Sequence, residues 1–312
     1  MIVQTITKTE AKPFLKWAGG KSQLLSAIDL YLPRAFRREP NVTYIEPFVG
    51  GGAMLFYMLQ NYHNIRHAVI NDINVRLINT YKVIRDEPYR LIDALKAMQS
   101  TFKALCSYEG QKEYYLNVRE RFNHSELSNV EQAAYMIFLN RTCFNGLYRE
   151  NSKGDFNVPF GRYANPAICR EEVIVADSEL LQGVEILSGD FSQTAGYIQG
   201  YTFFYLDPPY RPLGGTSSFN SYVKEAFDDS EQIRLKEFYT DISGAGIKAM
   251  MSNSDCKGCN DEDDFLDMLY KDFYIERVYA NRCINANPTK RGTLTELLIR
   301  NYEEYQGKVT II

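Results

Sequence analysis

The chain has 312 residues, of which 45% are hydrophobic and 24% charged. This composition excludes a disordered or collagen-like chain, and the length suffices for one large α/β domain or a core domain with an insertion. The 35 Lys and Arg against 39 Asp and Glu give a net charge of −4, so bulk charge does not predict a nucleic-acid partner. No apolar run reaches the roughly 18 residues of a membrane span, and the six cysteines form no dense framework, which predicts a reduced, cytoplasmic protein.

Charge is nevertheless uneven along the chain. Residues 1–38 hold seven basic residues against two acids, a net +5, and residues 277–300 hold five against one, a net +4. Residues 255–276 hold eight acids against two lysines, a net −6. The two basic segments could dock a polyanion on one face, although charge alone equally fits ordinary solvated surfaces.

Hydrophobic periodicity predicts the elements in chain order. We expect buried strands at 42–46, 67–71, 184–187, 202–206 and 247–251, and helices at 53–62, from Pro88, and after the capping box formed by Ser128 and Glu131. The second helix carries apolar residues at helical spacing from Leu91 to Leu105, and the third places Tyr135, Phe138 and Leu139 on one side. Residues 143–167 are rich in Asn, Gly, Pro and Arg and predict an ordered loop. The alternation predicts an α/β fold with an open, mostly parallel sheet interrupted by an insertion.

A glycine turn, Glu46-Pro-Phe-Val-Gly-Gly-Gly52, joins the first strand to a helix. Glycines there permit a sharp bend and let a ligand approach the backbone and the helix N-terminus. Asp72 ends the next strand, where a carboxylate can hold both hydroxyls of a ribose. This pair fits NAD and S-adenosylmethionine alike, and the turn on its own also fits a purely structural role.

The segment from Lys12 to Ser22 holds the only Trp of the chain, Trp17, between Lys16 and Lys21. It is not a phosphate-binding P-loop, because Leu15 stands where that motif needs glycine. Lys21 could pair with a ligand carboxylate while Trp17 covers it. Alternatively, Trp17 anchors the N-terminal segment to the core.

Asp207-Pro208-Pro209-Tyr210 directly follows a buried strand, at the edge where open α/β sheets place their sites. The two prolines fix φ and remove two N–H donors, which leaves a stiff corner that presents carbonyls and a carboxylate. Such a corner offers acceptors to an amino group, and the tyrosine offers a flat face to a planar ring. A capped turn is the competing interpretation.

Together these motifs resemble the N6-adenine DNA methyltransferases of the Dam type. The likeness rests on Lys-Trp-Ala-Gly-Gly-Lys, the glycine turn, Asn71-Asp72 and the Asp-Pro-Pro-Tyr corner in this order, and it runs from about residue 12 to 302. Residues 140–151 and 154–163 are similar to the recognition stretch of members that methylate GATC. The resemblance implies a Rossmann-like methyltransferase fold, with a catalytic domain at 1–84 and 168–312 and an inserted, mainly helical target-recognition domain at 85–167.

The resemblance also implies the cofactor and the chemistry. S-adenosylmethionine would bind across Gly50, Gly51 and Gly52 and leave as S-adenosylhomocysteine. The further cofactor contacts that it implies are Trp17, Lys21, Asp72, Asp190, Phe191 and Asp207. A target adenine must be flipped out of the duplex. The catalytic corner would then act through Asp207 and the carbonyl of Pro208, which accept the two amine hydrogens, with Pro209 stiffening the loop and Tyr210 stacking on the base. No metal is implied.

Double-stranded DNA is the implied partner. Arg149 would contact guanine in bidentate fashion, Lys16 would contact the outer guanine, and Phe144 would insert beside the extruded base. The other DNA-binding residues carried over by position are Asn145, Leu147, Pro159, Arg162 and Tyr163. From residues alone, simple core packing would be favoured for Phe144 and Leu147. A monomer encoded by a bacterium or phage is expected, with a cognate restriction endonuclease as a conceivable partner.

Two other patterns receive no catalytic role. Cys256 and Cys259 form a C-x-x-C pair, but no second pair follows, so reduced thiols in a loop are favoured over zinc. The acidic run 261–264 is interpreted as a solvated loop. Two alternative functions stay open at this stage: an NAD(P)-dependent oxidoreductase, supported only by the glycine turn and Asp72, and a DNA-binding protein with an inactive methyltransferase core.

Overall fold

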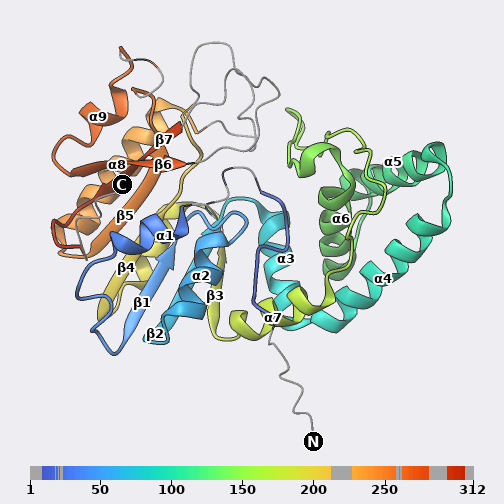
Figure 1. The fold of residues 1–312 in the computed structure, drawn as a ribbon, viewed down its shortest axis with the longest axis horizontal. Helices are drawn as coiled ribbons and strands as arrows, with labels where there is room; N and C mark the ends of the chain where they lie inside the picture. Colours follow the sequence, from blue (N-terminus) through green and yellow to red (C-terminus); the bar gives the residue numbers. More distant parts are fainter. Residues whose placement is uncertain are drawn as a thin grey trace, which may run out of the picture. The chain divides into compact units, whose positions relative to one another are not determined.

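The computed structural model describes residues 9–17, 19, 21, 24–211, 227–257, 260, 262–280 and 294–305 (Figure 1). Contacts divide the chain into two compact units. The helical unit comprises the described residues of Met1–Gly20, Gly50–Gln60 and Asn74–Ile186, and the sheet unit those of Lys21–Val49, Asn61–Ile73 and Leu187–Ile312. The predicted domain boundaries, at 84/85 and 167/168, stay a prediction.

The sheet confirms the predicted α/β class and its mostly parallel character. Its order is β3-β2-β1-β4-β5-β7-β6, and β1 pairs in parallel with β2 and β4, as β4 does with β5. The sequence analysis did not predict β6 and β7, which pair antiparallel with each other, as β7 also does with β5. The strand bounds are β1 Val42–Glu46, β2 Ile65–Asp72, β3 Val184–Ser188, β4 Tyr201–Leu206, β5 Lys248–Ser254, β6 Tyr274–Ala280 and β7 Leu294–Arg300.

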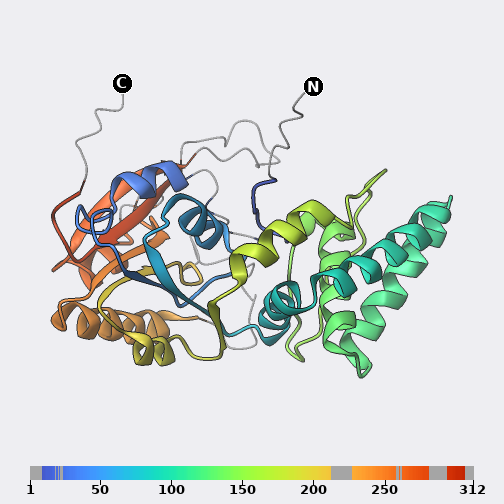
Figure 2. The same ribbon diagram turned by 90° about the horizontal axis from the view of Figure 1, so that it is seen from below.

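Alternate residues of β4 serve opposite faces of the sheet, because side chains of a strand point to the two sides in turn. Phe204 and Leu206 join the apolar cluster that includes Leu235 of α8 (Asp229–Gly244). Phe203 instead packs edge-on against Phe36, with ring centres 5.2 Å apart. The helices α1 (Leu25–Leu30) and α8 lie on opposite faces of the sheet (Figure 2). The sheet unit also contains η2 (Phe191–Tyr197) and α9 (Phe265–Leu269).

The helical unit is built around α6 (Asn129–Thr142), which packs against α3, α4 and α5 (Figure 1). The capping box of Ser128 and Glu131 is confirmed, as is Pro88 at the start of α4. Residues are buried on all sides of α6 rather than on the one side predicted, because helices surround it. The other bounds are α2 Ala53–Asn61, α3 Val75–Asp86, α4 Pro88–Ala104, α5 Tyr108–His124, η1 Phe144–Gly146 and α7 Glu171–Leu181.

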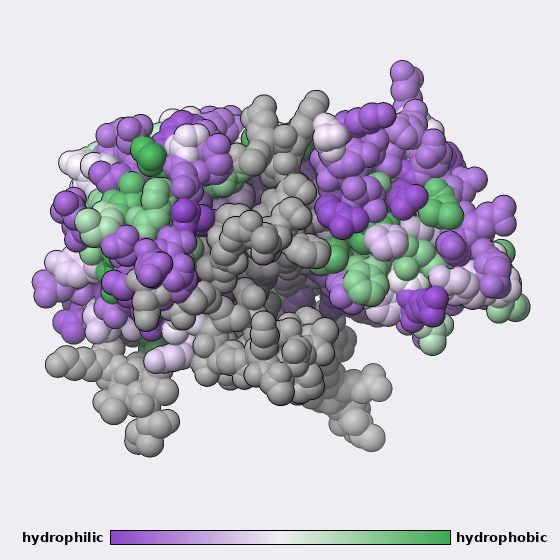
Figure 3. All heavy atoms as spheres, turned by 90° about the horizontal axis from the view of Figure 1, so that it is seen from above, coloured by the Kyte–Doolittle hydropathy of each residue, from purple (hydrophilic) through white to green (hydrophobic). Residues whose placement is uncertain are grey.

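The segment 143–167 has little regular structure, as predicted: it contains the short η1 and two isolated bridges, Cys143 to Phe160 and Glu150 to Phe156. None of the described helices offers an apolar stretch long enough to cross a membrane. Hydrophilic residues dominate the coloured surface in Figure 3, with apolar residues gathered in small patches between them.

Candidate active site

The Asp-Pro-Pro-Tyr corner lies at the carboxyl end of β4, between the neighbouring strands β1 and β5. The Oδ1 atom of Asp207 lies 3.0 Å from Nζ of Lys21 and accepts a hydrogen bond of 2.9 Å from Ser252. The carbonyl of Pro209 accepts a hydrogen bond of 3.2 Å from the buried side chain of Gln232 in α8. The corner is therefore held from both β5 and α8, which gives its carboxylate a defined position.

Lys21 is the centre of a polar group that we call the Lys21 cluster, formed with Asp207, Tyr210 and Glu296. Its side chain is 3% exposed, and its ammonium lies 3.2 Å from Oε2 of Glu296 as well as beside Asp207. The same Glu296 oxygen accepts a hydrogen bond of 2.7 Å from the hydroxyl of Tyr210. The Lys21 ammonium donates to that hydroxyl and lies 4.2 Å from the centre of the ring. The Lys21 ammonium thus contacts two carboxylates and a phenol.

Burial is the main cause that raises the pKa values of two members of the cluster, Asp207 and Tyr210. It raises the pKa of the Asp207 carboxyl above its ordinary value; the Lys21 ammonium opposes this rise and the charge of Glu296 adds to it. Burial, followed by the charges of Asp207 and Glu296, raises the pKa of Tyr210 well above its ordinary value. Tyr210 therefore stays a neutral hydrogen-bond donor, while Asp207 gains a proton at a higher pH than an exposed aspartate would.

The structure brings together Lys21, Asp207 and Tyr210 from the predicted site residues. Sequence analysis anticipated a ligand carboxylate as the partner of Lys21, whereas here its partners are carboxylates of the chain itself. It missed Glu296 and Ser252. A signal was present for Glu296, the one acid in the apolar run 294–299 of β7.

A second buried carboxyl lies at the carboxyl end of β1. Glu46 is 2% exposed and accepts a hydrogen bond of 2.8 Å from the hydroxyl of Tyr44. Burial raises the pKa of Glu46 well above its ordinary value, and the nearby charges of Asp207 and Asp72 act in the same direction. Sequence analysis treated Glu46 only as the first residue of the glycine motif. The structure places it at the carboxyl edge of the sheet, near the carboxylates of Asp207 and Asp72.

Asn71 ties together the loops at this edge of the sheet. Its amide nitrogen donates to the carbonyls of Pro47 and Gly189, each at 3.0 Å, and its carbonyl oxygen in the backbone accepts from Val49 at 2.9 Å. Asp72 follows at the end of β2, where its backbone carbonyl accepts a hydrogen bond of 3.1 Å from Gly189. These contacts fix the place of Asp72 at the carboxyl edge, as the sequence predicted.

The glycine turn needs its glycines for two separate reasons. Gly50 and Gly52 have φ angles of +48° and +76°, which L residues rarely adopt. A Cβ on Gly51 would lie 2.8 Å from the Cβ of Trp17, and one on Gly52 would collide with the hydroxyl of Tyr81. That hydroxyl donates to the carbonyl of Gly50 at 2.9 Å. Trp17 and Tyr81 therefore pack directly on the turn, within the helical unit.

Asp190 and Phe191 have clear structural contacts. Asp190 caps η2 through the amide of Ser192 and pairs with Arg234 at 2.6 Å. The hydrogen bond from Arg234 is the main cause that lowers the pKa of Asp190 to about 2. Phe191 is buried, its ring 5.3 Å from that of Phe48, and the Arg234 guanidinium lies 4.2 Å from its centre.

The predicted recognition stretch covers residues 140–151 and 154–163; the part that follows α6, residues 143–163, is hereafter the reading loop. Asn140, at the end of α6, joins it to the N-terminal segment: its side chain accepts from the amide of Lys16 at 2.8 Å and donates to the carbonyls of Lys16 and Gly146 at 2.8 and 2.9 Å. The ammonium of Lys16 lies 4.9 Å from the ring centre of Tyr163. Two predicted DNA-binding residues from distant segments therefore lie side by side.

The tip of the reading loop presents its side chains to solvent. Phe144 is 52% exposed, which differs from the full core packing that residues alone would have favoured. Asn145 beside it has a φ of +56°, and Leu147 is half-buried. Pro159 is exposed, and its carbonyl accepts a hydrogen bond of 2.9 Å from the amide of Phe144.

The two arginines of the loop differ in how they are held. The Nε of Arg149 donates to the side chain of Asn157 at 2.7 Å, so the guanidinium is oriented by a neighbour. Arg162 is exposed, and its guanidinium lies 5.3 Å from the ring centre of Tyr108. Trp17 stacks on Tyr148 of the loop, with ring centres 5.3 Å apart and an angle of 26° between the planes.

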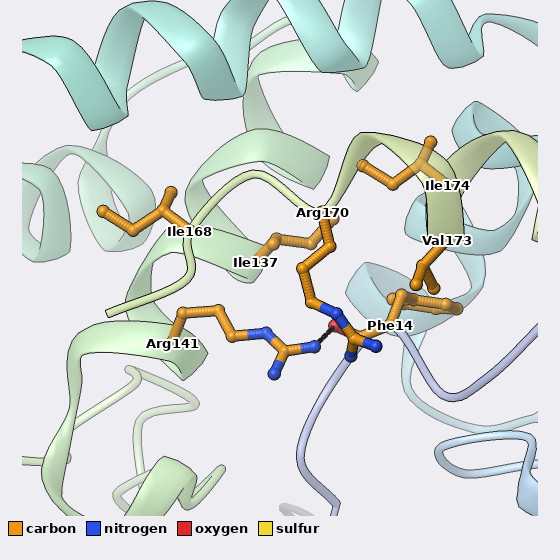
Figure 4. A pocket seen from close by; sticks show the side chains of 7 residues that line it. All are labelled: Phe14, Ile137, Arg141, Ile168, Arg170, Val173 and Ile174. Atoms are coloured by element: carbon orange, nitrogen blue, oxygen red, sulfur yellow. Dashed lines mark hydrogen bonds between the residues drawn. The ribbon is translucent and has the colours of Figure 1, made fainter. Parts of the chain in front are cut away.

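A pocket lies where Arg141 holds the N-terminal segment (Figure 4). An Nη of Arg141 donates to the carbonyl of Phe14 at 2.6 Å, and Arg170 reaches toward the same point in the figure. Burial lowers the pKa of Arg141 to about 10, and the charge of Arg170 adds to this. No predicted site residue lines the pocket. Its lining residues are Phe14, Ile137, Arg141, Ile168, Arg170, Val173 and Ile174.

The cysteine pair and the acidic run contribute no described site. Cys256 is buried beside Ser254, whereas Cys259 and residue 261 lie outside the described residues. Asp263 pairs with Arg211 at 2.6 Å rather than being simply solvated. No cluster of metal-ligating side chains occurs among the residues that the structure describes.

Comparison with protein families matches residues 17–284 to the D12 class of N6 adenine-specific DNA methyltransferases. The chain belongs to this family. It is 47% identical to the type II methyltransferase M.MjaIII of Methanocaldococcus jannaschii, over 94% of this chain and all of that protein. It is 39% identical to the type II methyltransferase M1.LlaDCHI of Lactococcus lactis subsp. cremoris, over 95% and 97% of the two chains. It is 33% identical to a DNA adenine methylase of Vibrio cholerae, over 92% and 95%.

Family membership confirms three predictions from the sequence. The protein is an adenine-specific DNA methyltransferase, its cofactor is S-adenosylmethionine and its substrate is DNA. The methyltransferase fold and the Dam-type resemblance are confirmed with it. The alternative of an NAD(P)-dependent oxidoreductase is wrong, since the glycine turn and Asp72 belong to a methyltransferase.

Proposed function

We propose that the enzyme methylates adenine flipped out of a GATC site in duplex DNA, with the Asp207 corner as the group that receives the extruded base. The observation that carries this proposal is the Lys21 cluster: a carboxylate fixed at the carboxyl end of β4, next to a tyrosine ring. Asp207 would accept one hydrogen of the target amine and the carbonyl of Pro208 the other.

These acceptors have a direct chemical effect. The nitrogen of adenine's amine is a poor nucleophile because its lone pair is conjugated with the ring. Two acceptors that hold both N–H bonds favour a geometry in which the lone pair points away from the ring plane. Pro209, with φ fixed and its carbonyl held by Gln232, keeps the corner from relaxing, and Tyr210 offers its face to the base. Positioning and fixed charges would supply most of the acceleration.

The residues at the carboxyl edge fit S-adenosylmethionine, which supplies an electrophilic methyl group on a sulfonium. In the sheet unit, Asp72 ends β2 and is suited to ribose hydroxyls, while Glu46 adds a buried acid suited to a positively charged ligand. Asp190, Phe191 and Lys21 are the further contacts proposed there. In the helical unit we assign Trp17 and the turn of Gly50, Gly51 and Gly52, whose backbone carries no side chains of its own.

We assign sequence reading to the reading loop and Lys16. Arg149, held by Asn157, is suited to a bidentate contact with guanine, and Lys16 to the outer guanine. The exposed Phe144 is suited to insertion beside the extruded base. Leu147, Pro159 and Tyr163 would contact the central base pairs, Arg162 would contact a phosphate, and Asn145 is a further proposed DNA contact. The likeness of residues 140–163 to GATC-methylating members supports the target.

Methylation of a random pool of duplex DNA, followed by base-resolution mapping of N6-methyladenine, tests this proposal. We expect the modified adenines to fall in GATC. A different shared motif would overturn the assignment of GATC while leaving adenine methylation intact. Modification without any shared sequence would remove the reading role of the loop.

We also propose a restriction–modification role and a monomeric enzyme. Two of the relatives are named type II methyltransferases, which supports the former. An endonuclease in host extracts that cuts unmethylated DNA, but not DNA modified by this enzyme, is the expected observation. Light scattering of the pure protein, with and without DNA, tests the monomer.

A further inference from the structure

Glu296 reaches the active-site edge because β7 runs against the parallel strands. Its register places Glu296 opposite Ser254, the last residue of β5, and opposite Val278 of β6. The first part of an antiparallel strand lies at the edge where the parallel strands end. An acid near the start of β7 is thereby delivered to the carboxyl ends of β4 and β5, beside Lys21.

Glu296 competes with Asp207 for one cation. The Lys21 ammonium lies 3.0 Å from Asp207 and 3.2 Å from Glu296, and the Glu296 side chain is only 13% exposed. The same Oε2 that faces Lys21 also accepts the hydrogen bond of Tyr210. A buried carboxylate that binds both the Lys21 ammonium and the Tyr210 hydroxyl fixes the positions of these two groups next to Asp207.

We propose that Glu296 is a positioning residue for methyl transfer: it shares Lys21, which keeps the Asp207 carboxylate available to the target amine, and it fixes the ring of Tyr210. The proposal rests on the assignment of Asp207 as the acceptor of that amine. Without Glu296, the ammonium would pair with Asp207 alone and would compete with the amine for its oxygens. The phenol of Tyr210 would also lose its hydrogen bond to Glu296.

The charges around Asp207 make the proposal measurable. It is faced by Lys21 from the segment before α1, by Glu296 from β7, by Glu46 and Tyr44 from β1, by Tyr205 from β4 and by Tyr210 within the corner. Ser252 on β5 adds a neutral hydrogen bond. Of the two carboxylates near Asp207, Glu296 is the one that also touches Lys21. Removing its charge lowers the pKa of Asp207, since a like charge disfavours the ionised form.

The test compares single-turnover methyl transfer, at saturating cofactor and duplex DNA, across roughly pH 5–9. For Glu296→Gln we expect a plateau rate about tenfold lower, because positioned hydrogen bonds act mainly on the transition state. The Kd for the same duplex, measured by fluorescence anisotropy, should be nearly unchanged. We also expect the acid limb of the profile to move to lower pH by about one unit, because Asp207 then keeps its charge longer. Glu296→Asp retains the charge and should restore the acid limb.

Glu276→Gln is the matched control. Glu276 pairs with Arg300 at 2.9 Å in the same β6–β7 hairpin, so this variant also loses an ion pair, but away from Asp207. Its profile should keep the wild-type shape. A Glu296→Gln variant with the wild-type rate, or one with a lower rate and an unmoved acid limb, would overturn the positioning role. Asp207→Ala in the same panel separates the two ideas: if it retains turnover, the proposed role of Asp207 fails first.

Discussion

The side chains of the Lys21 cluster and those of the reading loop differ in how they are held. In the cluster, side chains bind one another: Lys21 pairs with Asp207 and Glu296, and Tyr210 donates to Glu296. In the reading loop, Asn140 holds the backbone and Asn157 orients Arg149, while Phe144 remains exposed. In the proposed function, the cluster carries chemistry that is the same for every target, so its side chains can be fixed against one another. The loop is proposed to read the sequence, so its side chains have to present groups to the bases.

This difference predicts that substitutions in the two regions should have different effects on the enzyme. Changes in the cluster should alter rate and pH dependence without altering the choice of site. Changes in the reading loop should alter the choice of site and leave the pH dependence unchanged. Each of the following experiments tests one side of that division.

Asp207→Ala should have the largest effect. Loss of the fixed acceptor should lower single-turnover methyl transfer by about 10³-fold or more, while affinity for duplex DNA changes little. Rapid-quench assays and fluorescence anisotropy with the same duplex measure the two quantities. Substantial turnover in this variant would remove Asp207 from the chemistry.

Lys21→Met should have the next largest effect, which is a loss of stability. Removing the ammonium leaves two largely buried carboxylates unpaired, which costs about 3–5 kcal/mol of unfolding free energy at neutral pH. Without the Lys21 ammonium, which opposes the effect of burial, the pKa of Asp207 rises further in the folded state, so stability is retained at low pH and lost as pH rises through that value. Urea unfolding at several pH values measures this. A deficit that does not grow with pH would contradict the ion-pair account.

Arg149→Ala tests the proposed role of the reading loop. Loss of a bidentate guanine contact should cost about 1–3 kcal/mol of discrimination, roughly 10- to 100-fold, with the pH profile unchanged. Competition between GATC and single-substitution duplexes measures it. Arg162→Ala is the control: as a phosphate contact it should weaken all duplexes alike and lower the salt slope by about one. Equal weakening by both variants would make Arg149 a phosphate contact too.

Phe144→Ala should have the smallest effect on stability, within about 0.5 kcal/mol, because the ring is half exposed. Its loss should instead impair retention of the flipped base. Fluorescence of 2-aminopurine at the target position reports the flipped state, and thermal unfolding reports stability. A large fall in melting temperature with normal flipping would return Phe144 to a packing role.

Local signals in the sequence were sufficient for much of the fold. The run 42–46 matched β1 and the capping box matched the start of α6, because both depend on neighbouring residues. The corner at Asp207 could be predicted because a buried strand and two prolines are adjacent in sequence. The pairing of Lys21 with Glu296 could not, since it depends on β7 entering the sheet antiparallel, a strand that the analysis did not predict.

The most direct test of the separation between chemistry and sequence reading maps N6-methyladenine in one random duplex pool. The maps are made with the wild-type enzyme, with Glu296→Gln and with Arg149→Ala. The account predicts that Glu296→Gln modifies the wild-type motif to a lower extent, and that Arg149→Ala modifies additional sites differing at one guanine. A broadened motif with Glu296→Gln, or an unchanged motif with Arg149→Ala, would contradict it.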